Sequence, residues 1–268
     1  MERIWIIVQK ELALTLRTRM TLFTVVLMTV IFALIPLGVV YGSSLLGAAA
    51  STRRIDPQIL QALRDSNPTL RDLPADELFV GLLVSSMQSL FLLIPLITPL
   101  IIAVYSIIGE KQTRSLEAVL ATPVETSELL AGKCLAAAIP GILSAWLSYT
   151  VFLVLAAPGL PPVIMRDVVL RPEWLVAMAL VVPAGAFMAV IAGLIVSSRA
   201  SDPQSAQQIG SLVVLPVIGL LIGQVSGVVR LNLLLVGLIT IVLLAIDAGL
   251  LAAAVRLFQR ESILTRWK

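Results

Sequence analysis

The sequence predicts an all-α membrane protein with six transmembrane helices, and three observations carry this prediction. Of the 268 residues, 59% are hydrophobic and only 13% are charged, whereas about 25% of the residues in an ordinary soluble domain carry a charge. The mean hydropathy is +1.02. Six long stretches with at most one charged residue follow one another along the chain. A soluble fold of this composition would expose a large apolar surface to water, so a lipid bilayer is the expected environment.

Each apolar stretch is long enough to cross a membrane, because a helix needs about 20 apolar residues to span about 30 Å of hydrocarbon. Residues 1–268 are therefore expected to form a single transmembrane domain. Its predicted spans are residues 20–46, 78–108, 133–157, 174–198, 204–228 and 231–255.

Basic residues are shared unevenly between the two sides of the membrane, and this bias sets the expected orientation. With a cytoplasmic N-terminus, twelve of the 19 Lys and Arg residues lie inside and seven lie outside. We therefore expect a multi-pass protein of the cell (inner) membrane with cytoplasmic N- and C-termini. Residues 47–77 then form an external loop, and residues 157–173, with four prolines, are expected to form a rigid extended cap.

Residues 1–19 precede the first span and are predicted to form an amphipathic interfacial helix. Arg3, Lys10 and Arg17 recur every seven residues and therefore share one helix face. Such a basic amphipathic helix is suited to the inner membrane surface. The alternative is a simple extension of the first span. Four aliphatic residues lie on another face: Ile4, Val8, Leu12 and Leu16.

Residues 109–132 connect the second and third spans and form the one predicted cytoplasmic loop with a patterned surface. Leu116, Val119 and Leu120 lie at i, i+3 and i+4, which gives a short helix a small apolar face. On this pattern alone, two interpretations are equally good. The segment is either a helix that docks a soluble partner or a surface hairpin that only connects two spans.

The ends of this short helix also carry local signals. Glu110 and Arg114 are four residues apart, as in a helical ion pair. Thr122, Pro123 and Glu125 match an N-cap, the first helical position and the third helical position of a capping box. We therefore expect a sharp turn and a new helix that leads into the third span.

Residues 110–124 read EKQTRSLEAVLATPV, and Glu128 and residues 132–133 (Gly-Lys) follow them. This run resembles the signature of the ABC type-2 transporter permease family, E-(R/K)-x-x-(G/R)-(T/S)-L-E-x-L-L-x-T-P-(V/I), with an acid and a G-K before the third span. Val119 replaces the usual leucine and Ser115 stands where threonine is commoner. The N-terminal amphipathic helix, the six spans and the larger first external loop agree with the family in outline.

The resemblance implies the permease subunit of an ATP-driven ABC exporter. Two permeases, either two copies of this chain or this chain and a paralogous permease, would form the translocation path. Each would rest on a separate cytoplasmic ATP-binding subunit, which receives the loop helix as a coupling helix. The residues expected to couple the permease to the ATPase are Glu110, Arg114, Leu116, Glu117, Leu120, Thr122 and Pro123.

The chain by itself is not expected to be an enzyme. It contains no histidine, which excludes histidine-based triads and histidine-ligated metal sites. A nucleotide-binding loop of the form G-x-x-x-x-G-K-[ST] is missing, because Gly132-Lys133-Cys134 lacks the upstream glycine and the hydroxyl. No catalytic, cofactor-binding or metal residues are predicted. ATP and Mg²⁺ are expected on the partner subunit, and the expected partners include the lipid bilayer but no nucleic acid.

Apart from Lys133 at the very start of the third predicted span, Asp247 is the only charged residue inside a predicted span, and an ionisable group at that depth is a candidate for function. It is either a structural group between helices or part of a path for substrate or ions. In the second case the alternative function is a self-contained secondary transporter or channel with Asp247 as its intramembrane ion site. The sequence shows no clear internal repeat of the kind that such carriers often have.

Gln224 lies near the outer end of the fifth predicted span. The resemblance places the second and fifth spans around the translocation path, so Gln224 is a further candidate for that path. The alternative is an amide that holds two helices together. No motif in the chain selects a class of substrate.

Small residues and prolines predict how the spans pack and bend. Stripes of small residues at four-residue spacing allow close helix crossings, and packing within one subunit is favoured over a dimer seam. Kinks are expected in each of the first five spans, because each contains a proline. The stripes are Gly185, Ala189, Gly193 and Ser197; Gly219, Gly223 and Gly227; and Ala245, Gly249 and Ala253. The prolines are Pro36, Pro95, Pro99, Pro140, Pro183 and Pro216.

Overall fold

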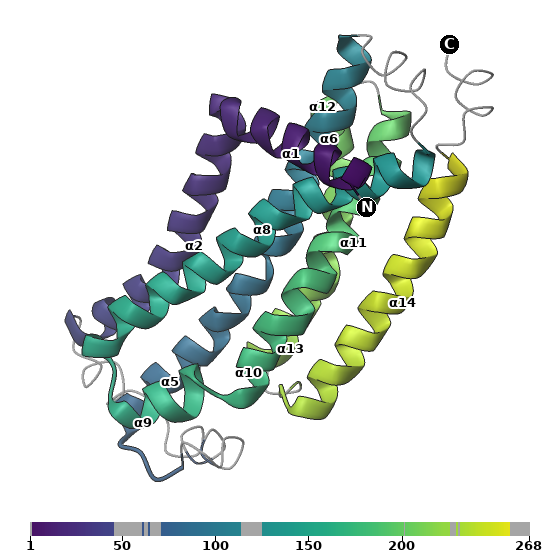
Figure 1. Ribbon diagram of the computed structural model, residues 1–268. Helices are drawn as coiled ribbons and strands as arrows, with labels where there is room; N and C mark the ends of the chain where they lie inside the picture. The colour runs from purple at the N-terminus through teal and green to yellow at the C-terminus, as the bar shows by residue number, and fades with distance from the viewer. Residues whose placement is uncertain are drawn as a thin grey trace.

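The computed structural model is a bundle of long helices that run up and down between two ends (Figure 1). It describes residues 2–45, 61, 64, 71–113, 125–200, 202–225, 229 and 231–257, and within these residues every regular element is helical. The described residues contain six helical stretches that are long and apolar enough to cross a membrane, which confirms the predicted fold class. These are Thr21–Gly42, Ala75–Gln112, Ser127–Gly159, Pro172–Arg199, Pro203–Gln224 and Leu233–Leu257.

The first and last described helices both reach the same end of the bundle, which we call the α1 end (Figure 1). Helix α1 (Glu2–Arg17) lies across this end. The end of α6 (Ile94–Gln112), the beginning of α8 (Thr126–Ala156) and the end of α14 (Leu233–Leu257) lie there too. The loop between the second and third spans therefore shares the α1 end with the N-terminal helix.

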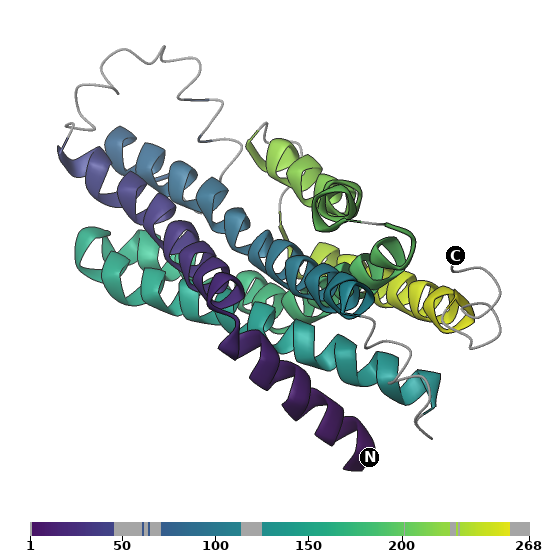
Figure 2. The ribbon, with the colours of Figure 1, turned by 90° about the horizontal axis from the view of Figure 1, so that it is seen from above.

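The N-terminal segment forms a separate helix, α1, and does not simply extend the first span. Thr18 interrupts the helix, and α2 (Arg19–Leu45) then turns away toward the opposite end of the bundle (Figures 1 and 2). The predicted apolar face of α1 is buried only in part, because Val8 is fully buried whereas Leu16 is exposed. The two ends of this face therefore lie in different surroundings.

Three of the six spans change from an α-helix to another helix type and then back, and a proline stands in the first turn of the α-helix that resumes. A proline costs little there, because the first turn has no intrahelical partner for the missing N–H group. Pro95, Pro183 and Pro216 occupy these positions. The second span joins α5 (Ala75–Gln88), the 3₁₀ helix η2 (Ser89–Leu92) and α6. The fourth joins α10 (Pro172–Val176), the π-helix η5 (Ala177–Val181) and α11 (Val182–Arg199). The fifth joins α12 (Pro203–Gly210), the 3₁₀ helix η6 (Ser211–Val214) and α13 (Leu215–Val225).

The predicted extended cap at residues 157–173 is wrong. This segment folds into short helical turns, because Pro162 and Pro172 each stand at a helix start, where the fixed φ of proline favours a helix. Ile164 and Val169 are fully buried, so the segment belongs to the core at that end of the bundle. Its elements are η3 (Ala157–Gly159), α9 (Pro162–Ile164) and the π-helix η4 (Met165–Val169).

Helix α11 packs along α6, and glycine makes the close approach possible. A Cβ atom added to Gly193 would lie 3.1 Å from Leu100 Cδ1 and 3.2 Å from Ala103 Cβ, both on α6. This stripe of small residues therefore serves packing within one subunit, as predicted. Gly219 on α13 and Gly249 on α14 have no such neighbour within 4 Å in the described part of the chain.

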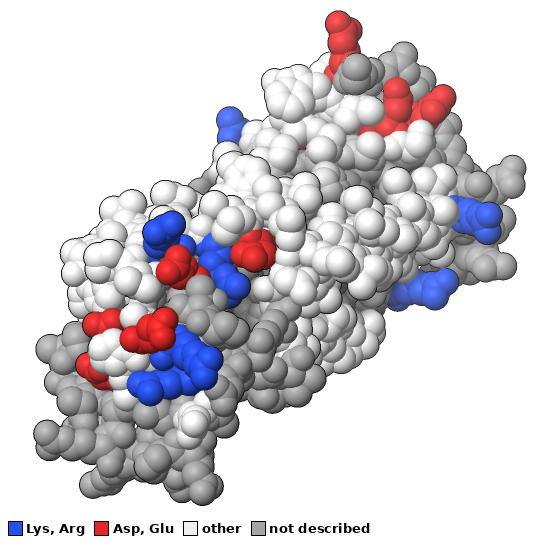
Figure 3. Space-filling model, turned by 90° about the horizontal axis from the view of Figure 1, so that it is seen from below, with Lys and Arg blue, Asp and Glu red and all other residues white. Residues whose placement is uncertain are grey.

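The surface of the bundle is arranged as a bilayer requires. Large apolar side chains on the outer helices are exposed, for example Phe23 on α2, Ile222 on α13 and Leu234 on α14. Charged side chains gather toward the two ends of the face shown in Figure 3, and a broad band of uncharged side chains lies between them. Such a band places the apolar side chains in hydrocarbon and the charges in water.

Candidate functional site

The loop between the second and third spans is the predicted coupling site, and the structure describes both of its edges. Helix α6 ends at Gln112 and α8 begins at Thr126, side by side with α1 at the α1 end. Glu110 lies in the last turn of α6. The other predicted coupling residues lie outside the described residues: Arg114, Leu116, Glu117, Leu120, Thr122 and Pro123.

The N-cap of α8 lies three residues later than predicted. Glu125 has an extended backbone, with φ −69° and ψ 147°, and its side chain accepts a hydrogen bond from the backbone of Glu128. In return, the Glu125 backbone N–H donates to the Glu128 carboxylate over 3.2 Å. The capping box therefore consists of Glu125 and Glu128, and the prediction that Glu125 is the third residue of this helix is wrong. Two carboxylates three residues apart satisfy the free N–H groups of the first turn in both directions.

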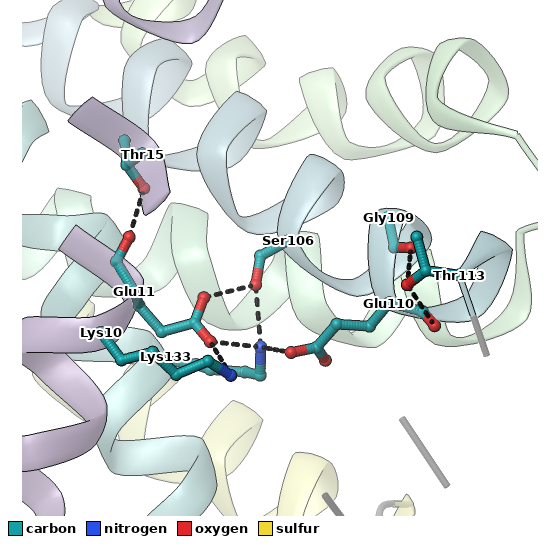
Figure 4. A network of polar contacts seen from close by, with 8 residues as sticks. All are labelled: Lys10, Glu11, Thr15, Ser106, Gly109, Glu110, Thr113 and Lys133. Atoms are coloured by element: carbon teal, nitrogen blue, oxygen red, sulfur yellow. Dashed lines mark hydrogen bonds and ion pairs between the residues drawn. The ribbon is translucent and has the colours of Figure 1, made fainter. Parts of the chain in front are cut away.

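A buried lysine joins three helices at the edges of the loop (Figure 4). The side chain of Lys133, on α8, is only 2% exposed. Its Nζ donates to Glu110 Oε1 at 2.8 Å and to Ser106 Oγ at 2.9 Å, both on α6. It also donates to Glu11 Oε1, on α1, at 3.2 Å. These three acceptors match the three donors of an ammonium group, so Lys133 holds α1, α6 and α8 together.

The charges of this Lys133 network are not evenly matched in its buried part. Two carboxylates, of Glu11 and Glu110, face one buried ammonium. Lys10 adds a second cation from the surface, since its Nζ lies 3.6 Å from Glu11 Oε1 and its side chain is 55% exposed. Glu110 Oε2 is buried and has no hydrogen-bond partner among the described residues. Because a buried charge is costly unless it is paired, Lys133, Glu11 and Glu110 depend on one another.

Glycine lets α1 approach α8 next to the network. A Cβ atom added to Gly132 would lie 2.6 Å from Ile7 Cγ2, closer than any real side chain tolerates. The Gly132-Lys133 pair therefore has two linked roles. Gly132 brings α1 close enough for Glu11 to reach Lys133, and Lys133 completes the ion pairs.

Lys111 binds a different helix. Its Nζ donates to the backbone carbonyl oxygens of Ser197 at 2.8 Å, Ser198 at 2.7 Å and Ala200 at 3.2 Å. These carbonyls end α11, where free C=O groups attract cations. The neighbouring residues Glu110 and Lys111 thus hold two separate parts of the bundle, α8 with α1 and the end of α11.

Sequence reasoning missed the partners of Lys133. Glu110 was expected to pair with Arg114, which lies outside the described residues, but its described partner is Lys133. A signal for Glu11 is present, because it lies three residues after Val8 on the helix face that α1 buries. A carboxylate on a buried apolar face needs a cation, but the sequence does not say which one.

Asp247 is half-buried on α14, and its Oδ1 is buried without a hydrogen-bond partner among the described residues. In the part of the chain that is described, no three Cys, Asp or Glu side chains are placed to hold a metal ion.

Gln224 bridges the second and fifth spans. Its Oε1 accepts a hydrogen bond from Ser89 Oγ in η2. Gln224 lies near the end of α13 away from α1, whereas Asp247 lies past the middle of α14 on the way to the α1 end. The two candidate path residues therefore lie at different depths of the bundle.

The comparison with protein families covers most of the chain. A family model described as ABC-2 family transporter protein matches residues 5–246, which include the loop and every member of the Lys133 network. No curated protein matches the chain.

Proposed function

The chain belongs to the ABC-2 family of transporter proteins and is a multi-pass permease subunit of an ABC transporter; we propose that it works as an ATP-driven exporter, whose ATP hydrolysis takes place on separate cytoplasmic subunits. Residues 109–132 couple the permease to these ATP-binding subunits. In this proposal Arg114, Leu116, Glu117 and Leu120 dock into the ATP-binding subunit, Glu110 anchors the base of the loop through Lys133, and Thr122 and Pro123 set the angle of the docked helix. ATP and Mg²⁺ bind to that partner.

The observation that carries the proposal is the pair of anchors at the root of the loop. A loop that only connects two helices needs no buried charges, and burying an ammonium costs several kcal/mol unless it is fully paired. Lys133 is nevertheless buried between Glu110 and Glu11, and Lys111 holds the end of α11. Such connections suit a loop that must transmit movement to several helices at once.

The orientation follows from the same proposal. The α1 end is then cytoplasmic, since the ATP-binding subunit is there, and the basic residues Lys10, Arg17, Lys111 and Arg199 lie at that end. Trp5 is exposed on α1, the helix that also carries Lys10 and Arg17, which suits a helix at the inner surface of the cell (inner) membrane.

A second permease, either another copy of this chain or a paralogue, completes the translocation path in this proposal. The stripes at Gly219 on α13 and Gly249 on α14 support a further packing surface, because neither glycine has a neighbour within 4 Å in the described part of the chain. Small residues at such a surface let helices approach closely in lipid.

The unpartnered Oδ1 of Asp247 favours a second candidate function, a secondary transporter or channel that needs no ATPase. The two candidates differ in one measurement. Ion flux in liposomes that contain only this chain supports the second candidate, whereas flux that requires the ATP-binding subunit and ATP supports the first.

Co-purification with an ATP-binding subunit tests the proposed function directly. The double variant Leu116→Asp/Leu120→Asp is expected to lose the subunit while it still inserts into the membrane, because two carboxylates cannot enter an apolar groove unpaired. Gln204→Asp, at an exposed position on α12 at the same end, is the matched control and is expected to retain the subunit. Equal retention by the double variant and the control contradicts the coupling role.

A further inference from the structure

We propose that Glu110 and Lys111 are positioning residues that divide the movement of the coupling loop between two routes. Glu110 passes it through Lys133 to α8 and α1, and Lys111 passes it to α11 and α12. This inference rests on the proposed function, since it requires that a partner moves the loop. It goes beyond that function by assigning to each route its own residue and its own helices.

The first route is a set of short, buried ion pairs. Lys133 Nζ lies 2.8 Å from Glu110 Oε1 and 3.2 Å from Glu11 Oε1. Ser106 Oγ closes the set, because it accepts from Lys133 and donates to Glu11 Oε2 at 3.2 Å. Bonds between charged groups are stronger than neutral ones, and in a buried site no water replaces a partner that moves away. Movement of Glu110 therefore takes Lys133 and Glu11 with it.

The second route ends on backbone atoms. Lys111 Nζ binds three carbonyl oxygens at the end of α11, and α12 begins three residues after the last of them, at Pro203. The beginning of α12 is capped, because Asp202 Oδ1 accepts a hydrogen bond from the Ser205 backbone N–H at 2.8 Å. A displacement of Lys111 therefore reaches both the fourth and the fifth spans.

The two routes begin on adjacent residues, and helix geometry separates them. Successive side chains on an α-helix point about 100° apart, since a turn contains about 3.6 residues. Glu110 and Lys111 in the last turn of α6 thus face different neighbours. Rotation or tilting of this single turn acts on both groups of helices at once, and removal of one side chain leaves the other route intact.

The experiment measures the two routes separately in the full chain, assembled with its ATP-binding subunit in lipid nanodiscs. Spin labels at Gln9→Cys on α1 and at Gln204→Cys on α12 report the two routes, each paired with Arg166→Cys at the opposite end. All three positions are exposed. Cys134, which is buried, is replaced by Ala in every variant. Distances are recorded by double electron–electron resonance with and without a non-hydrolysable ATP analogue.

Lys111→Met is expected to abolish the ATP-dependent change of the 204–166 distance and to keep that of the 9–166 distance. Glu110→Gln is expected to reduce the change of the 9–166 distance and to keep that of the 204–166 distance. Lys10→Met, which removes an exposed lysine at the edge of the network, is the control and is expected to keep both changes. Affinity for the ATP-binding subunit is measured for each variant. A residue that only stabilises the fold would not remove one distance change and leave the other unaltered.

A fully neutral variant guards against misfolding. Glu11→Gln/Glu110→Gln/Lys133→Met removes all three charges, so that no single buried charge is left unpaired. It is expected to lose the change of the 9–166 distance alone. The proposal is wrong if Lys111→Met and Glu110→Gln bind the subunit and keep both ATP-dependent distance changes. It is also wrong if either of these two variants loses both distance changes. If the wild-type protein does not bind the subunit, the proposed function is wrong, and so is the assignment of Glu110 and Lys111 to two routes.

Discussion

The ammonium of Lys133 lies 2.8 Å from the carboxylate of Glu110 and so closes the base of the loop between the second and third spans. The two residues are 23 positions apart, and the pair joins the last turn of α6 to the first turns of α8. The pair therefore holds together the two helices that flank the loop.

Removal of the lysine should destabilise the fold. Lys133→Met leaves two buried carboxylates without their cation, and breaking a buried ion pair on one side costs about 3–5 kcal/mol. Thermal unfolding of the purified chain in detergent measures the loss. Lys10→Met removes a lysine that is 55% exposed, and surface pairs contribute about 0–1 kcal/mol, so little change is expected. A Lys133→Met protein as stable as the control contradicts the burial of a paired charge.

Gly132→Ala should separate α1 from α8. The new Cβ would lie 2.6 Å from Ile7 Cγ2, so α1 must move, at a cost of about 1–3 kcal/mol for an overpacked contact. Gly109→Ala is the matched control, because nothing lies within 4 Å of its Cβ among the described residues and alanine favours a helix. Thermal stability and limited proteolysis within residues 1–17 report the difference, and equal behaviour of the two variants speaks against the close contact.

Asp247→Asn should leave insertion and assembly with the ATP-binding subunit unchanged. The amide keeps the shape of the side chain and removes a charge that is expensive in a membrane. ATP-dependent activity of the reconstituted complex is expected to match that of wild type if the group is structural. Loss of ion flux in this variant at normal expression points instead to Asp247 as part of the path.

The N-cap of α12 should give a pH-dependent contribution to stability. The hydrogen bond from the Ser205 backbone N–H lowers the pKa of Asp202 below its ordinary value. A lowered folded-state pKa means that the contribution is fully present above the ordinary pKa of the carboxyl, about 3.9, and is lost as the pH falls through the lowered value.

Thermal unfolding of wild type and Asp202→Ala over a pH series measures this contribution. The difference between the two proteins is expected to be constant near neutral pH and to shrink only in strong acid. Asp202→Asn keeps an oxygen acceptor without a titrating charge, so its difference from Asp202→Ala is expected to stay constant with pH. A wild-type advantage that already disappears at pH 6 is inconsistent with the lowered pKa.

Local sequence was enough for the spans and for part of the site. Each apolar stretch crosses a membrane because of its own length and composition, so the six spans need no knowledge of their neighbours. The motif around Glu110 was sufficient to indicate the family, which the match over residues 5–246 shows. The N-cap of α8 was predicted wrongly from local sequence, because Thr122 and Glu125 match the pattern of a capping box, whereas the helix uses Glu125 and Glu128, and glutamate is not among the residues that favour an N-cap.

The sequence by itself determined that this chain is a six-span helical membrane protein whose second and third spans are joined by a charged loop. The tertiary structure alone decided which charges meet. Glu11 reaches Lys133 across 122 residues, and Lys111 reaches Ser198 across 87. Pairs of this kind depend on which helices lie side by side and on how closely Gly132 lets them approach, and neither follows from the pattern of any single helix.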